Sequence, residues 1–145
     1  MDSPRALEPI RLAPDILPAI EADLACTPDL ERCGLISGPG RVGQTIHPIP
    51  NCAADPKRAF SMAPEELIAA FARIEAAGET LTAIYHSHPN GRASPSASDV
   101  AQAHYREAGY LIGVWTSGAL QMRGFRWAAA NAAEGFVEVE VAIEA

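Results

Sequence analysis

The chain reads TLTAIYHSHP from Thr80 to Pro89, a β-rich run that ends in two histidines one residue apart. Its composition and length predict a strand. Residues two apart in a strand point to the same side, so His86 and His88 are expected to present two imidazoles side by side at the strand's C-terminal end. Ligand sites of open α/β sheets tend to lie at that end. Two imidazole nitrogens are half of a tetrahedral zinc site.

Helices and strands alternate around this segment. Apolar residues at helical spacing predict a helix over 14–27, with Asp15 as its cap, and a second over 63–78. The apolar stripe of the second helix is assigned to the core and consists of Leu67, Ile68, Phe71 and Ile74. A third helix is expected over 96–108. Further strands are expected over 8–12, 33–38, 44–50, 110–116, 120–127 and 136–143, with brief pairing at 60–62. This order predicts one sheet with helices against its faces, in a single domain over 1–145.

The charge of the chain argues against nucleic acid as a partner. The chain has 11 basic and 18 acidic residues, for a net charge of -7. The basic residues form no cluster that could follow a phosphate backbone. Since no apolar run has the length of a signal peptide or a membrane span, we expect a cytoplasmic protein with no membrane partner. The sequence gives no indication of its oligomeric state.

Three cysteines, an odd number without CxxC spacing, suggest neither a disulfide framework nor an all-cysteine zinc site. This fits a reducing compartment. Cys33, two residues after Glu31, could be a nucleophile or a ligand, but a small buried residue on a core strand is the commoner use. His47, which precedes a proline in an expected turn, is assigned to the surface.

A carboxylate follows the histidine pair at Asp99, at the expected start of the third helix. Two histidines, one carboxylate and an open fourth position form the arrangement of catalytic zinc. Ser96 and Asp99 also fit a capping box, in which both residues serve the helix and the carboxylate is less free to bind metal. A zinc hydrolase needs a base and an oxyanion donor as well. The nearby hydroxyls are Ser87, Ser94, Ser96 and Ser98, and physical reasoning does not choose among them.

Taken together, Glu31, HSHP at 86–89, Ser96 and Asp99 resemble the pattern E…H-[S/T]-H-P-x6-S-x2-D of the JAMM (MPN+ or JAB) metallopeptidases. ERCGLISG, NCAADPKRAFSMAPEEL and YLIGVW are also similar to segments of the small prokaryotic members. The resemblance covers residues 8–127. It implies a deaminase-like α/β/α sandwich with a mixed central β-sheet flanked by helices.

The resemblance also implies roles for the matching residues. His86, His88 and Asp99 would bind one zinc ion per chain, Glu31 would be the general acid/base, and Ser96 would donate a hydrogen bond to the tetrahedral intermediate. The implied reaction is hydrolysis of a peptide or isopeptide bond after the C-terminal glycine of a ubiquitin-like or sulfur-carrier protein. The Gly-Gly tail is expected to bind beside an edge strand by β-strand addition. Ser87, between the two ligands, is expected to face the other side of the strand.

Two other functions remain as alternatives. A non-catalytic scaffold of the MPN type would share the fold but lack the ligands, so the zinc content of the purified protein would separate it from the enzyme. A zinc deaminase would share the layered fold but carries an H-x-E…P-C-x-x-C pattern that this sequence lacks.

Overall fold

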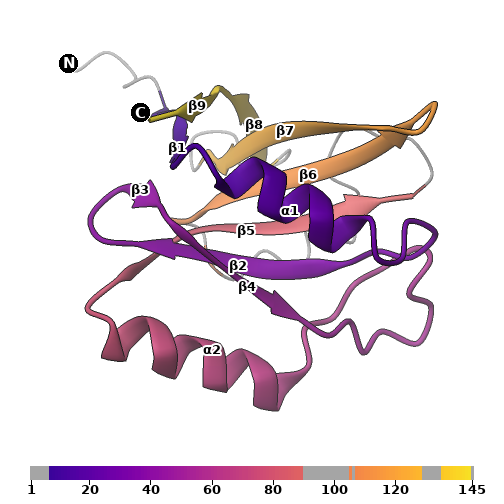
Figure 1. Cartoon of the computed structure of the whole chain (residues 1–145), viewed down its shortest axis with the longest axis horizontal. Helices are drawn as coiled ribbons and strands as arrows, with labels where there is room; N and C mark the ends of the chain where they lie inside the picture. Colours follow the sequence, from indigo (N-terminus) through magenta and orange to yellow (C-terminus); the bar gives the residue numbers. More distant parts are fainter. Residues whose placement is uncertain (1–6, 90–104, 106, 129–134, 145) are drawn as a thin grey trace.

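The structure is a computed structural model that describes residues 7–89, 105, 107–128 and 135–144. Its centre is a mixed six-stranded sheet with the order β4-β2-β5-β6-β7-β8 (Figure 1). The strands are β4 (Thr45–Ile49), β2 (Cys33–Gly38), β5 (Thr80–His88), β6 (Gly109–Thr116), β7 (Ala119–Trp127) and β8 (Phe136–Val139). Only β5 and β6 run parallel among these neighbours. Because β2 runs antiparallel to β5, the start of β2 lies beside the end of β5.

A second, smaller sheet has the order β3-β1-β9 and consists of β3 (Val42–Gly43), β1 (Ile10–Leu12) and β9 (Val141–Ile143). The prediction of one sheet was therefore wrong, as was that of one strand over 136–143. The chain changes sheets at Glu140, whose carbonyl oxygen accepts a hydrogen bond from the Ile10 N–H at 2.9 Å. Before this point β8 pairs with β7, and after it β9 pairs with β1. Local alternation of side chains cannot reveal such a change of partner.

Helix α1 (Ile16–Leu24) covers one face of the main sheet (Figure 1). Its buried residues recur every fourth position, at Ile16, Ile20 and Leu24, and they share a cluster with residues of β2 and β5. Such spacing places them on one side of a helix. Asp15 occupies the N-cap position, but its side chain makes no capping hydrogen bond, so the predicted cap is wrong.

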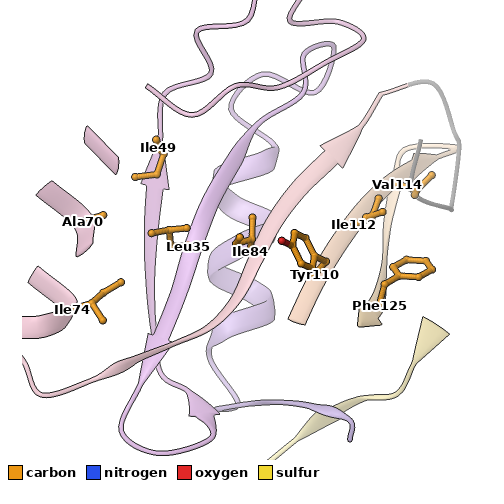
Figure 2. Close-up of a cluster of buried hydrophobic side chains, with 9 residues drawn as sticks. All are labelled: Leu35, Ile49, Ala70, Ile74, Ile84, Tyr110, Ile112, Val114 and Phe125. Atoms are coloured by element: carbon orange, nitrogen blue, oxygen red, sulfur yellow. The ribbon is translucent and has the colours of Figure 1, made fainter. Parts of the chain in front are cut away.

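Helix α2 (Pro64–Ala76) covers the opposite face, where Ala70 and Ile74 pack against Leu35 and Ile84 of the sheet (Figure 2). The predicted stripe was wrong at Ile68, which is 70% exposed. Successive residues of a helix are rotated by about 100° around its axis. When residues 67, 70, 71 and 74 face the sheet, position 68 therefore lies on the side of the helix that faces solvent. The helix ends before Gly78, whose φ of 69° is accessible to glycine without strain.

The two helices on opposite faces of a mixed sheet confirm the predicted α/β/α sandwich. The expected third helix lies outside the described residues except at its end. There, Tyr105, Glu107 and Ala108 are not helical, so the predicted end at Ala108 was wrong. Within the described part of the chain, no helix is both long and apolar enough to cross a membrane.

Candidate metal centre

His86 and His88 lie at the end of β5, where both side chains are almost fully buried, at 2% and 3% exposure. Their Nε2 atoms are 3.1 Å apart, and the rings meet edge to face with centroids 4.9 Å apart. Both side chains point to the face of the sheet that α2 covers, because Ile84 lies in the cluster with α2 and side chains on a strand alternate. The two imidazoles therefore converge on one point.

Glu31 reaches the same point from the residues just before β2. In the β2–β5 ladder Cys33 lies opposite His86. Two residues earlier, Glu31 falls on the same side of the sheet, since strand side chains alternate with a period of two. The carboxylate is 5% exposed, and the ligand atoms of Glu31, His86 and His88 all lie within 4.8 Å of one another. Antiparallel pairing thus joins residues that are far apart in sequence into one buried group.

The loop that follows β4 holds the backbone of Glu31. The Glu31 N–H donates to the Pro56 carbonyl at 2.7 Å, and the Asn51 side-chain amide donates to the Glu31 carbonyl at 2.8 Å. Asn51 also shapes the loop itself, through the Ala59 carbonyl and the Ser61 N–H. Sequence reasoning missed Asn51. The sequence feature that indicated this role is an asparagine at the start of a loop, since asparagine side chains often hydrogen-bond to nearby backbone groups.

An aromatic residue of the same loop fixes the first histidine. Phe60 stacks on His86 with ring centroids 4.4 Å apart and an angle of 26° between the planes. Such stacking restricts rotation of the imidazole. Sequence reasoning took residues 60–62 only as a brief pairing, and one isolated bridge does join Met62 to Asn51.

On the opposite face, a polar network joins α1 to the strands below it. The Arg32 guanidinium donates to Asp23 Oδ1 at 2.8 Å, and the Tyr85 hydroxyl donates to Asp23 Oδ2 at 2.7 Å. Burial, followed by this hydrogen bond, raises the pKa of Tyr85, so the phenol stays protonated and acts as a donor. Arg32 thus lies on the other face of the sheet from the two histidines and anchors the start of β2 to α1.

Cys33 behaves as a small buried residue and not as a nucleophile. Its Sγ donates to the Ile49 carbonyl at 3.4 Å, and burial raises the pKa of its thiol to about 12. His47, expected at the surface, is 8% exposed, and its Nε2 lies 2.8 Å from the buried Ser37 hydroxyl. The surface assignment was wrong because β4 packs His47 against β2. Ser96 and Asp99 lie outside the described residues.

The buried group fits a divalent transition metal. Imidazole and carboxylate are common zinc ligands, and two nitrogens at about 2.0–2.1 Å from a tetrahedral zinc are roughly 3.3 Å apart. The observed separation of 3.1 Å between the two Nε2 atoms is close to this. Beside the group lies a pocket of about 400 Å³. It is lined by Thr27, Leu30, Glu31, Arg32, Pro48, Ile49, Pro50, Asn51 and Pro56.

The α/β/α sandwich and the buried group of Glu31, His86 and His88 are the fold and the side chains expected of a JAMM-type metalloprotease. The sequence matches the family described as prokaryotic homologues of the JAB domain over residues 14–129. The chain therefore belongs to this family, as the resemblance predicted.

Similar proteins agree with this assignment. A desampylase from Haloferax volcanii is 34% identical over 119 residues, which cover 81% of each chain. A probable TtuB-protein conjugate cleaving protease from Thermus thermophilus is 39% identical over 83 residues, which cover 57% of this chain and 55% of that protein. Among solved structures, a JAB1/MPN domain protein from Archaeoglobus fulgidus superimposes with a TM-score of 0.59 at 17% identity, covering 91% of this chain and 98% of that one. This last likeness concerns the fold alone.

Proposed function

We propose that the chain is a zinc-dependent peptidase that cleaves the bond after the C-terminal glycine of a ubiquitin-like or sulfur-carrier protein. The observation that carries the proposal is the buried group of Glu31, His86 and His88 at the end of β5. One carboxylate and two imidazoles, buried with their ligand atoms within 4.8 Å of one another, are donor types that catalytic zinc binds. The names of the two relatives, a desampylase and a conjugate cleaving protease, support the substrate class.

His86, His88 and Asp99 would hold one zinc ion per chain. A bound zinc supplies a Lewis acid that lowers the pKa of water and polarises the scissile carbonyl. This assignment keeps Glu31 free of the metal. Phe60 stacks on the ring of His86 and restricts its rotation.

Glu31 would act as the general base and then as the general acid. Its carboxylate takes a proton from the attacking water and passes it to the leaving amine. Support comes from its position within 4.8 Å of the histidine nitrogens and from the hydrogen bonds of its own N–H and C=O to the loop after β4. Ser96 would donate a hydrogen bond to the oxyanion of the tetrahedral intermediate.

The tail of the substrate would enter beside β4, an edge strand of the main sheet. Pro48 and Ile49 of this strand line the same pocket as Glu31. Two glycines have no side chains to clash with such a cleft, and β-strand addition would position the tail through its backbone. Pro48 has no N–H, so the pairing would have to use other residues of β4.

Intact-mass spectrometry tests the proposal. Ubiquitin-like and sulfur-carrier proteins that carry a few residues after Gly-Gly, or an isopeptide-linked lysine peptide, are incubated with the zinc-loaded protein. We expect cleavage directly after the second glycine, and cleavage at least about 100-fold slower with Glu31→Gln. Absence of cleavage of every carrier by the zinc-loaded protein would contradict the substrate assignment. A purified protein that binds no divalent metal would instead favour the scaffold.

A further inference from the structure

We propose that Ser87 is a positioning residue for the general base, and that it sets the distance between Glu31 and the two histidines. The inference rests on the proposed role of Glu31. Ser87 lies between His86 and His88 in the chain, yet its side chain points to the other face of β5. There it is completely buried. It therefore cannot bind the metal, and its contacts have to explain its presence.

Those contacts hold the residues on both sides of Glu31. The Ser87 hydroxyl oxygen accepts a hydrogen bond from the Arg32 N–H at 2.9 Å. The same hydroxyl donates to the Leu30 carbonyl at 3.3 Å. The Ser87 N–H donates to the Arg32 carbonyl at 3.0 Å. A hydroxyl can donate and accept at once, which an alanine or valine side chain cannot do.

The covalent neighbours of Ser87 give these contacts their importance. His86 and His88, which carry the two imidazoles, flank Ser87 in the chain. Leu30 and Arg32, which Ser87 bonds, flank Glu31, the proposed base. Two further hydrogen bonds to the Glu31 backbone come from Asn51 and Pro56 in the loop, which is not part of the strand that carries the proposed ligands. Ser87 thus links the segment that carries the proposed base directly to the strand that carries the two histidines.

Loss of the hydroxyl leaves the Leu30 carbonyl and the Arg32 N–H without this partner. We expect the segment from Leu30 to Arg32 to move away from β5 by a few tenths of an ångström to about 1 Å, a displacement that can cost up to about 100-fold in rate. The proposed zinc ligands lie outside the segment from Leu30 to Arg32, and the tail of the substrate is proposed to pair with the backbone of β4. The loss should therefore appear in kcat and not in KM or in the zinc content.

Full-length zinc-loaded protein is compared with Ser87→Ala, Ser87→Thr and the control Ser37→Ala. Ser37 is also completely buried on a strand and bonds two side chains, those of His47 and Glu79, but these bonds lie outside the metal centre. We expect Ser87→Ala to lower kcat about 10- to 100-fold, with KM changed less than about threefold and one zinc per chain retained. Ser87→Thr, which keeps the hydroxyl, should recover most of kcat. Ser37→Ala should keep the wild-type kcat.

A structural readout is independent of catalysis. In two-dimensional ¹H–¹⁵N spectra the Arg32 amide should shift and exchange faster in Ser87→Ala, and Ser87→Thr should restore it. If Ser87→Ala does not fold, Ser87→Cys replaces it, since the thiol keeps the volume but bonds weakly. In a Glu31→Gln background, Ser87→Ala should cause no further loss of the residual rate.

The outcomes separate the two proposals. Cleavage by Ser87→Ala at the wild-type kcat would overturn the positioning role and leave the peptidase intact. Loss of zinc in Ser87→Ala, or a further 10-fold loss in the Glu31→Gln background, would show that Ser87 acts on the ligands and would also overturn it. Failure of the zinc-loaded wild-type protein to cleave any carrier would reject the proposed function, and the role of Ser87 would fall with it.

Discussion

Glu31 lies close enough to the two histidines to act either as a metal ligand or as a base. Glu31→Gln distinguishes the roles, because an amide cannot take up a proton at neutral pH and is a poor zinc ligand. If Glu31 is a base and not a ligand, we expect Glu31→Gln to lower kcat about 100- to 10,000-fold and to retain one zinc per chain. The measurements are steady-state kinetics and metal analysis, with His88→Ala as the variant that loses zinc. Loss of zinc in both variants would make Glu31 a ligand.

Cys33 yields a prediction about chemical reactivity. With a thiol pKa of about 12, only about one molecule in 10,000 carries the thiolate at pH 8. Cys26 and Cys52 are exposed. A disulfide reagent at pH 8 should therefore modify two thiols in the folded protein and the third only in denaturant. Cys33→Ala should show two reactive thiols in both states, and rapid reaction of three thiols in the folded wild-type protein would contradict the burial of Cys33.

Individual residues also show what sequence can and cannot predict about the site. The shared orientation of His86 and His88 follows from the period of a strand. Glu31 could be assigned only through the family resemblance, because its place depends on antiparallel pairing with a strand far along the chain. Asn51 and Phe60 were missed for the same reason. Their roles appear only when the loop after β4 folds onto the site.

The packing of α1 on β2 and β5 depends on a residue without a side chain. A Cβ at Gly34 would lie 2.4 Å from the Tyr85 hydroxyl oxygen and 2.5 Å from its ring. Tyr85 is completely buried and bonded to Asp23, so the ring cannot move aside. We expect Gly34→Ala to lower the free energy of unfolding by about 1–3 kcal/mol in urea denaturation.

A double-mutant cycle tests this steric origin. In a Tyr85→Leu background the ring is absent, and Gly34→Ala should cost much less there than in the wild-type protein. An equal cost in both backgrounds would mean that the loss comes from the backbone of β2 and not from the contact between Gly34 and Tyr85.

The pairing of β4 with β2 brings a histidine into the protein interior. Burial, with a contribution from Arg73 that Glu79 partly offsets, lowers the pKa of His47. The unfolded chain therefore binds this proton at a higher pH than the folded one, and stability falls as the pH drops below about 6.5. The free energy of unfolding of the wild-type protein, minus that of His47→Gln, should decrease between pH 7 and pH 5. Parallel curves would contradict a lowered pKa.

The elements themselves were predicted more successfully than their partners. β2, β4, β5 and β6 follow from short apolar runs bounded by turn residues, and α2 from its helical spacing. The division of residues 136–143 between two sheets was not predictable, because β8 and β9 are both short β-prone segments and the local sequence does not specify the strand with which each one pairs. Pairing is decided by the assembled sheet.

Metal binding should stabilise the whole molecule, because His86 and His88 lie side by side only in the folded sheet and zinc that binds the folded chain shifts the unfolding equilibrium. Free zinc at 100 times its Kd contributes about 2.7 kcal/mol when the unfolded chain does not bind it. For a chain of 145 residues this corresponds to a rise of roughly 5–10 °C in Tm. Calorimetry of chelator-treated protein with and without zinc measures the shift. His88→Ala should abolish it and Ser37→Ala should keep it, whereas an equal shift in His88→Ala would place the bound zinc away from the end of β5.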